Sequence, residues 1–212
     1  MGVFCVAALV CFNCAAQVLA WLVEPAGHLV YTAPSGGFKA LTTVTVVMAF
    51  LVSAPFVLYQ LWAFVAVALK PDERRFICLF GPLSLVFFAF GVAFAFFVAV
   101  PMAYRFLTGF STEYMSPLIT VDSYMSFLAS MVVAFGVTFE LPLLLAVLAK
   151  MGIATPEFLR QKRRHAIMII LIVAAVATPP DVVSQLLLAV PLMMLYELGI
   201  IFVRACYKHK TL

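Results

Sequence analysis

Long apolar runs alternate with short charged segments along the chain of 212 residues. About 20 consecutive apolar residues form a helix long enough to cross the roughly 30 Å hydrocarbon core of a bilayer. The last apolar region, 165–203, is interrupted by Thr-Pro-Pro-Asp at 178–181, and two consecutive prolines cannot continue a helix. The pattern therefore predicts one domain, 1–212, of six transmembrane helices with approximate bounds 2–23, 41–68, 76–105, 123–149, 165–178 and 182–203.

The last two predicted helices are expected to be short. From His165 to Pro180 there are 16 residues, which is about 24 Å of helix and less than the thickness of the core. The sixth helix is also short if Asp181 caps its start. Short helices beside long ones leave a recess and thin the bilayer locally, at a modest cost in free energy.

Composition supports an all-α polytopic membrane protein. The chain is 66% hydrophobic and only 10% charged, whereas soluble domains are about 25% charged. Of the 13 Lys and Arg residues, 11 fall after the second, fourth and sixth helices, and only Lys39 and Arg105 fall on the other side. Because cytoplasmic loops are enriched in Lys and Arg, both termini are predicted to be cytoplasmic.

Several classes of chemistry leave no trace in the sequence. There is no His-Glu-x-x-His, no Gly-x-Ser-x-Gly and no Walker A motif, and the three histidines lie outside the middle of the spans. We therefore expect no enzyme activity, no cofactor and no metal. The net charge of +4 is explained by loops at the membrane face, so no nucleic-acid partner is expected.

Glu140 is the single ionisable residue between 123 and 149. It lies 10 residues before Lys150, about 15 Å along a helix, which places it near the middle of the membrane. A charge there costs a few kcal/mol, so we expect Glu140 to be protonated, paired or facing water. It is either a neutral acid bonded to a neighbouring helix or a polar patch in a groove for another protein's helix. Pro142 is expected to bend this helix.

Glu197 is the second carboxylate within an apolar run, seven residues before Arg204. One interpretation is a side chain that reaches the cytoplasmic headgroups or pairs with a basic residue. The other is a small ion-coupled secondary transporter that uses Glu140 and Glu197 as proton carriers. Such a transporter would move its substrate without any other subunit.

Four sequence blocks, taken in order, resemble a single family. They are SAPFVLYQLWAFVAVALKPDERR (53–75), GVAFAFFVAVPMAYRFL (91–107), YMSFLASMVVAFGVTFELPLLLAVLAKMGIATPEFLRQKRR (124–164) and ATPPDVVSQLLLAVPLMMLYEL (177–198). The family is TatC, the integral membrane subunit of the twin-arginine protein translocase. The resemblance covers nearly everything from about residue 32 onward.

The resemblance implies a receptor that uses the proton-motive force to export folded proteins. Its implied partners are twin-arginine signal peptides, the single-span subunits TatB and TatA, further copies of itself and the lipid bilayer. Its implied location is the cell inner membrane, or the thylakoid membrane for a plastid protein. Carried over by position, the implied site residues are Phe64 and Glu73 for signal peptides, Glu140, Thr178, Asp181 and Gln185 for partner subunits, and Pro25 and Phe38 for assembly at the first external loop.

Some of these residues also have simpler interpretations. Beside Arg74 and Arg75, Glu73 is suited to a local ion pair as well as to docking a cationic peptide. Asp181 is suited to capping the last helix, and Gln185, one turn later, to a hydrogen bond between helices. A protein of assembly alone, indifferent to paired arginines, is a further alternative.

The chain departs from the family pattern at several places. Gly36 stands where the family has a glutamate, Val67 stands where it has a proline, and Phe96 where tyrosine is more usual. The family normally opens with a cytoplasmic tail carrying a His-Leu-x-Glu-Leu-Arg-type stretch, and this sequence begins almost inside its first span. We expect either a truncated start or a tail that is dispensable.

Overall fold

The structure, a computed structural model, describes residues 2–23, 29–31, 33–68, 74–109, 118–178 and 182–208. Within these ranges the regular elements are all helical, as the sequence predicted. They are α1 (Gly2–Val23), α2 (Gly36–Ala68), α3 (Arg74–Phe94), a π-helical segment (Ala95–Ala99), α4 (Val100–Thr108), α5 (Val121–Thr138), α6 (Leu141–Lys150), α7 (Pro156–Gln161), α8 (Arg163–Ala177) and α9 (Val182–Lys208).

Among the described residues, five stretches of helix are long and apolar enough to cross a membrane. They are Phe4–Val23, Gly36–Val67, Phe80–Thr108, Val121–Lys150 and Gln185–Arg204. The fifth predicted span corresponds to α8, which has 15 residues and is short as expected. The last helix is not short, because α9 has 27 residues. No helix-breaking residue follows Val203, so the helix continues through Arg204 to Lys208.

The third span is one continuous helical path with a π-helical segment in its middle. The backbone N–H of Val100 bonds to the carbonyl of Ala95, five residues earlier, and Pro101 begins α4. Proline has no N–H to donate to Phe97, so the regular α-helical bonding pattern cannot continue through this turn. The sequence placed a helix here but did not predict the π segment.

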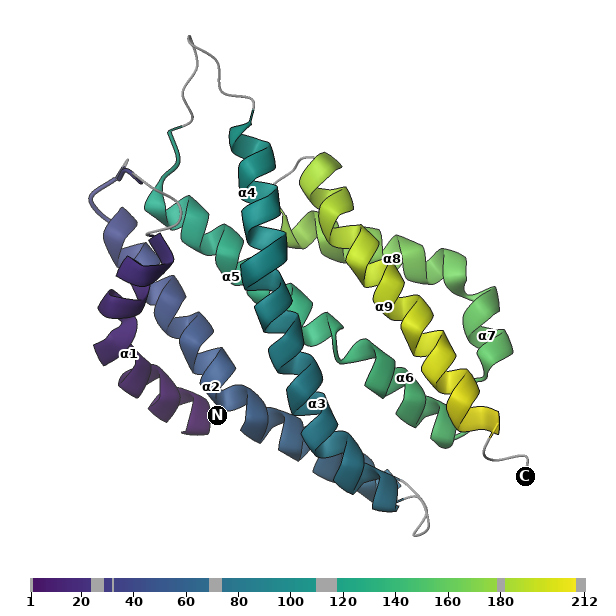
Figure 1. The fold of residues 1–212 in the computed structure, drawn as a ribbon. Helices are drawn as coiled ribbons and strands as arrows, with labels where there is room; N and C mark the ends of the chain where they lie inside the picture. Colours follow the sequence, from purple (N-terminus) through teal and green to yellow (C-terminus); the bar gives the residue numbers. More distant parts are fainter. Residues whose placement is uncertain are drawn as a thin grey trace.

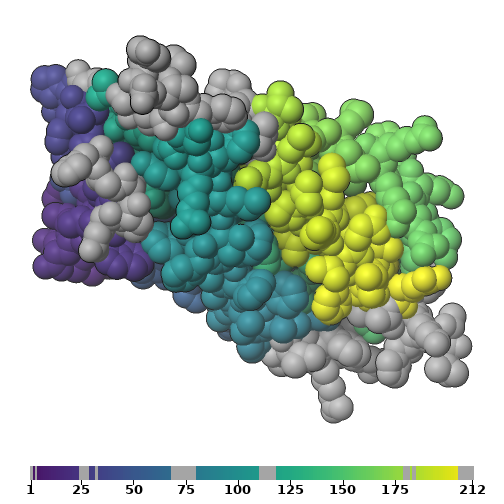
Figure 2. Space-filling view, turned by 45° about the horizontal axis from the view of Figure 1, so that its top comes forward, coloured from purple at the N-terminus to yellow at the C-terminus, as the bar shows by residue number. Residues whose placement is uncertain are grey.

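The helix α5 lies at the centre of the bundle. In Figure 1 it runs behind α3, with α1 and α2 on one side and α8 and α9 on the other. The space-filling view in Figure 2 shows the third span, in teal, filling the middle of one face between the purple and the yellow ends. The side chains of α5 that face the core include Met125, Met131 and Phe135, and all three are almost fully buried.

The outer surface of the bundle is strongly apolar. Large side chains such as Leu9, Val86 and Val176 are more than half exposed. On a soluble protein such a surface would drive aggregation, whereas a hydrocarbon solvent matches it. The chain is therefore a multi-pass membrane protein.

Loop contacts fix the two ends of the bundle. At the end that holds the first loop, Val30 donates to the carbonyl of Ile119 at 3.2 Å and accepts from the N–H of Val121 at 3.2 Å. At the other end α6 ends at Lys150, and the chain turns at Gly152, whose φ of +79° suits glycine. The N–H of Ile153 donates to the carbonyl of Leu148 at 2.9 Å. The short helix α7 follows, and its first turn is capped by Thr155.

Candidate functional site

Glu140 lies at a break in the fourth span, between α5 and α6. Pro142 has no N–H to donate to Thr138, one turn earlier, and the N–H of Glu140 bonds to Val137 at 3.2 Å in a tighter turn. The Thr138 hydroxyl donates to the carbonyl of Ala134 at 2.6 Å. The predicted bend at Pro142 is therefore confirmed, and the carboxylate sits where regular helix is interrupted.

The Glu140 side chain is buried inside the bundle and bonded across helices. It is 6% exposed, and its Oε1 accepts a hydrogen bond of 3.1 Å from the Ser84 hydroxyl on α3. Its Oε2 is also buried and has no hydrogen-bond partner in the part of the chain that the structure describes. This geometry matches the first interpretation above, a carboxyl group bonded to a neighbouring helix.

Close packing of α3 on α5 brings Ser84 to Glu140. A Cβ atom added at Gly91 would lie 2.8 Å from the carbonyl oxygen of Phe135 and 2.9 Å from the Phe139 side chain. A Cβ at Gly136 would lie 2.9 Å from the ring of Phe88. Two glycines therefore allow the helices to approach, and Ser84 lies two turns before Gly91 on α3.

Of the three predicted partner-contact residues where α8 meets α9, the structure describes Thr178 and Gln185, and both form hydrogen bonds within the chain. Thr178 ends α8, is 7% exposed and donates to the carbonyl of Ala174 at 2.8 Å. Gln185 donates through Nε2 to the carbonyl of Leu171 at 3.1 Å, which is the hydrogen bond between helices that the sequence suggested. Asp181 lies outside the described residues. Glu140 is bonded to α3 and Gln185 to α8, so these polar groups do not form one hydrogen-bonded cluster.

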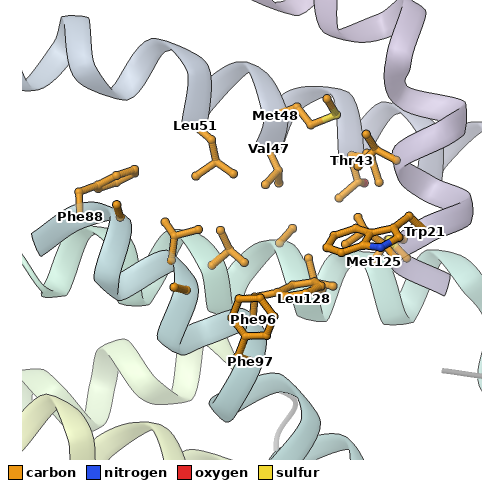
Figure 3. Close-up of a pocket in the computed structure, with 18 of the residues that line it drawn as sticks. Trp21, Thr43, Val47, Met48, Leu51, Phe88, Phe96, Phe97, Met125 and Leu128 are labelled. Carbon is orange, nitrogen blue, oxygen red and sulfur yellow. The ribbon is translucent and has the colours of Figure 1, made fainter. Parts of the chain in front are cut away.

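Apolar cavities open beside these polar residues. One of about 430 Å³ lies between the third span and α9, where it is lined by Phe94, Met102, Leu186 and Pro191 among others. Phe94 also packs on Phe139, next to Glu140, with ring centroids 5.8 Å apart. A second cavity, of about 550 Å³, lies between α1, α2, the third span and α5 (Figure 3).

Of the two predicted signal-peptide residues, the structure describes one. Phe64, in the last turns of α2, is 80% exposed, and Glu73 lies outside the described residues. A cavity of about 530 Å³ beside Phe64 is lined by Tyr59, Trp62 and Pro82 among others. Trp62 stacks on Phe80 at 6.0 Å between ring centroids, and its buried Nε1 has no hydrogen-bond partner among the described residues.

The first-loop residues are only partly described. Phe38 is 69% exposed and lies in the first turns of α2, not in the loop, because the helix begins at Gly36. A Cβ at Gly36 would lie 3.5 Å from the Tyr31 ring and 3.9 Å from the Asp122 carboxylate. A glutamate there, as the family has, would place two carboxylates side by side. Pro25 lies outside the described residues.

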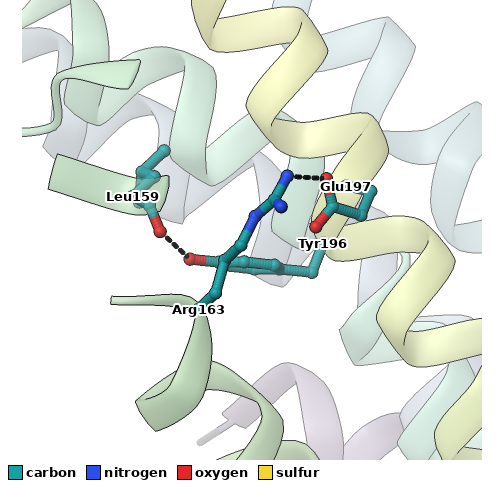
Figure 4. Close-up of polar contacts among 4 residues, drawn as sticks. All are labelled: Leu159, Arg163, Tyr196 and Glu197. Atoms are coloured by element: carbon teal, nitrogen blue, oxygen red, sulfur yellow. Dashed lines mark hydrogen bonds and ion pairs between the residues drawn. The ribbon is translucent and has the colours of Figure 1, made fainter. Parts of the chain in front are cut away.

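Glu197, in the half of α9 nearer the C-terminus, pairs with Arg163 at the start of α8. Its Oε2 accepts a hydrogen bond of 2.6 Å from Nη2 of Arg163, and both side chains are about half exposed (Figure 4). The neighbouring Tyr196 donates from its hydroxyl to the carbonyl of Leu159 at 2.9 Å. The ion pair confirms the simpler interpretation of Glu197, a carboxylate that pairs with a basic residue.

The sequence did not predict the residues that hold these groups in place. In the sequence, Ser84 is one small residue in an apolar run. The short helix α7, whose Leu159 carbonyl accepts the hydrogen bond from Tyr196, lies in what the sequence indicated as a basic loop. Among the described residues no group of three or more His, Cys, Asp or Glu side chains is arranged to hold a metal ion.

The fold and the site identify the class of protein: a multi-pass helical membrane protein with a carboxylate buried at a helix break. The family described as "Sec-independent protein translocase protein (TatC)" matches residues 1–191. A protein with that name from Carboxydothermus hydrogenoformans is 37% identical over 200 residues, which is 92% of this chain and 82% of the relative. The Escherichia coli K12 protein of the same name is 40% identical over 161 residues, 76% of this chain and 62% of the relative.

Solved structures agree with this assignment. A crystal structure described as the twin arginine translocase receptor TatC matches with a TM-score of 0.87 and 33% identity, over 96% of this chain and 92% of the other. A second structure of that receptor, in the detergent DDM, matches with a TM-score of 0.83 and 34% identity, over 94% and 92%. The chain belongs to the TatC family.

Proposed function

We propose that this chain is the receptor and core scaffold of a twin-arginine translocase, and that it exports folded proteins using the proton-motive force. The observation that carries the proposal is the match of nearly the whole fold to a twin-arginine translocase receptor. On this proposal the chain lies in the cell inner membrane, or in a thylakoid membrane, with both termini in the cytoplasm. It acts by binding and not by catalysis.

Signal peptides would bind at the turn between α2 and α3. A carboxylate accepts two parallel hydrogen bonds from one arginine, and Glu73 is the acidic residue next to the start of α3. The exposed ring of Phe64 and the apolar cavity beside it would take the apolar residues that follow paired arginines. Two arginines and an apolar segment would thus be recognised by adjacent, chemically different surfaces.

Site-specific photo-crosslinking from the position of Phe64 tests this site. A precursor with a twin-arginine signal should crosslink, and a matched precursor with both arginines changed to lysine should lose at least nine-tenths of the product. Equal crosslinking of both precursors would show that the motif is not read here. Loss of both would favour the assembly-only or transporter alternatives.

Partner subunits TatB and TatA would place their single helices against the side of the bundle that holds Glu140, and other copies of the chain would pack at the first loop near Pro25 and Phe38. The cavity between the third span and α9 would supply an apolar contact for such a helix. The buried Oε2 of Glu140 would add a polar contact only if the surrounding helices move apart. Thr178 and Gln185 lie at the end of the bundle where α9 begins, and Asp181 is three residues after Thr178 in the sequence. A hydrogen bond between the side chains of two helices in hydrocarbon contributes about 1 kcal/mol to their association.

Substitutions at Glu140 test whether the group works as a neutral hydrogen-bonding partner. Glu140→Gln keeps two polar atoms and should retain export within about twofold, because no charge is needed. Glu140→Ala removes the bond to Ser84 and should reduce export and co-purification of the partner subunits at least tenfold. Equal losses in both variants would contradict a neutral role and would point to an ionised or proton-carrying carboxylate.

A further inference from the structure

The cavity of about 550 Å³ between α1, α2, the third span and α5 has no role in the proposed receptor function. Its walls are almost entirely hydrocarbon. Thr43 and the indole of Trp21 carry the only side-chain nitrogen or oxygen atoms among the residues that line it. Figure 3 shows Val47, Met48 and Leu51 of α2 facing Leu128 and the third span across the open space. The cavity therefore suits an apolar occupant.

The cavity is elongated along α2, and aromatic rings lie at both of its ends. It extends along α2 from Thr43 to Pro55, which is about 18 Å of helix and close to the roughly 15 Å thickness of one leaflet's hydrocarbon. At one end Trp21 stacks on Phe96 with ring centroids 5.2 Å apart and 14° between the planes. At the other end lies Phe88, whose ring packs against that of Phe50 with the ring centroids 5.9 Å apart. The length matches one lipid chain.

We propose that this cavity binds one acyl chain of a membrane phospholipid. A dry protein cavity of about 150 Å³ holds the six carbons of benzene, or roughly 25 Å³ for each carbon. The volume here therefore has room for about 20 carbons. A transmembrane helix about 10 Å wide and 30 Å long needs on the order of 2,400 Å³, so a partner helix does not fit inside.

The bound chain would join α1 to the rest of the bundle. Trp21 of α1 forms one end of the cavity, α2 and the third span form its sides, and Leu128 and Val132 of α5 form part of its base. The lining offers no charged group for a phosphate, so the headgroup would stay outside, in the leaflet that surrounds the first loop. The proposal does not depend on the receptor function, although two lining residues at one end, Pro55 and Leu85, also line the cavity near Phe64.

Lipid binding to the delipidated protein in detergent tests the proposal. The chain has two tryptophans, so a Trp62→Phe background leaves Trp21 as the single fluorophore at the cavity. Phosphatidylglycerol with brominated chains should quench Trp21 saturably, and native mass spectrometry should show one retained lipid for each chain. Ala129→Phe and Ala93→Phe fill the cavity from two different helices and should each weaken both signals at least tenfold.

A matched control separates the cavity from lipid that merely surrounds the protein. Ala175 is exposed on α8, away from the cavity, so Ala175→Phe should leave quenching and lipid retention unchanged. Circular dichroism and gel filtration identify any variant that fails to fold, and the second filling variant then decides. Quenching and lipid retention that stay at the wild-type level in a folded filling variant would overturn the proposal.

Crosslinking in native membranes tests the identity of the occupant. A photoreactive residue at Met48, in the wall of the cavity, should label phospholipid. Labelling of a partner protein instead would overturn the acyl-chain assignment and make the cavity a protein-docking site. Failure of the lipid test would leave twin-arginine crosslinking at Phe64 unchanged, so the two proposals are distinguishable.

Discussion

At the scale of single residues, the unusual feature is a carboxylate that is buried in a hydrocarbon-spanning bundle with one direct partner. The fully buried Ser84 donates a hydrogen bond to Oε1 of Glu140. The other carboxyl oxygen of Glu140, Oε2, has no hydrogen-bond partner among the described residues. An unpaired buried oxygen is costly, so it persists where it serves another purpose or where a visiting group pairs it. In the proposed receptor a partner helix would reach this oxygen only after the surrounding helices move apart.

Ser84 is therefore predicted to be a positioning residue for Glu140. Ser84→Ala leaves both carboxyl oxygens unpaired and should lower the free energy of unfolding in detergent by about 1–3 kcal/mol. It should also reduce co-purification of partner subunits, because the carboxyl group is no longer held in one orientation. Denaturant titration and affinity co-purification measure the two effects.

Ser53 offers a matched control for that measurement. It is also nearly fully buried, but its hydroxyl donates at 3.1 Å to the carbonyl of Phe50 in its own helix. Ser53→Ala leaves no carboxyl group unpaired and should have little effect on either readout. If both alanine variants behave alike, the bond from Ser84 to Glu140 is not what matters.

At the scale of helices, two prolines and two glycines shape the site. Pro101 accompanies the π segment of the third span, Pro142 produces the break at Glu140, and Gly91 and Gly136 let α3 and α5 touch. Hydrophobic patterning predicted all six helices within a few residues, because a long apolar run in a bilayer has little choice but to form a helix. It did not predict the faces that pack, since lipid and protein interior favour the same side chains.

The contact of α3 on α5 can be tested with one methyl group. At Gly91 an added Cβ lies 2.8 Å from a backbone oxygen that cannot move aside, so Gly91→Ala should lower the free energy of unfolding by about 1–3 kcal/mol. Gly81, earlier in the same helix, has nothing within 4 Å of its added Cβ. Gly81→Ala should be neutral or stabilise the helix by up to about 1 kcal/mol. Thermal unfolding in the same detergent compares them, and equal destabilisation would contradict the close approach.

At the scale of the whole molecule, the sequence alone left three functions open: a receptor, a proton-coupled transporter and a protein of assembly alone. The transporter required Glu140 and Glu197 as carriers along one path. The structure separates them, because Glu140 is buried at a helix break whereas Glu197 is about half exposed and paired with Arg163. The pattern of charges predicted where basic residues gather but not which of them Glu197 meets, since that depends on how α8 turns back onto α9.

The ion pair between Arg163 and Glu197 therefore gives the last prediction. It ties the start of α8 to α9, and as an exposed pair it should contribute only about 0.2–1 kcal/mol to the free energy of unfolding. Glu197→Gln should leave export of twin-arginine precursors within about twofold of wild type, because the receptor does not need this charge to bind cargo. A double-mutant cycle with Arg163→Gln measures the pair itself. Abolition of transport by Glu197→Gln, with a folded protein and intact partner binding, would revive the proton carrier. Retention of export would exclude Glu197 as an essential proton carrier.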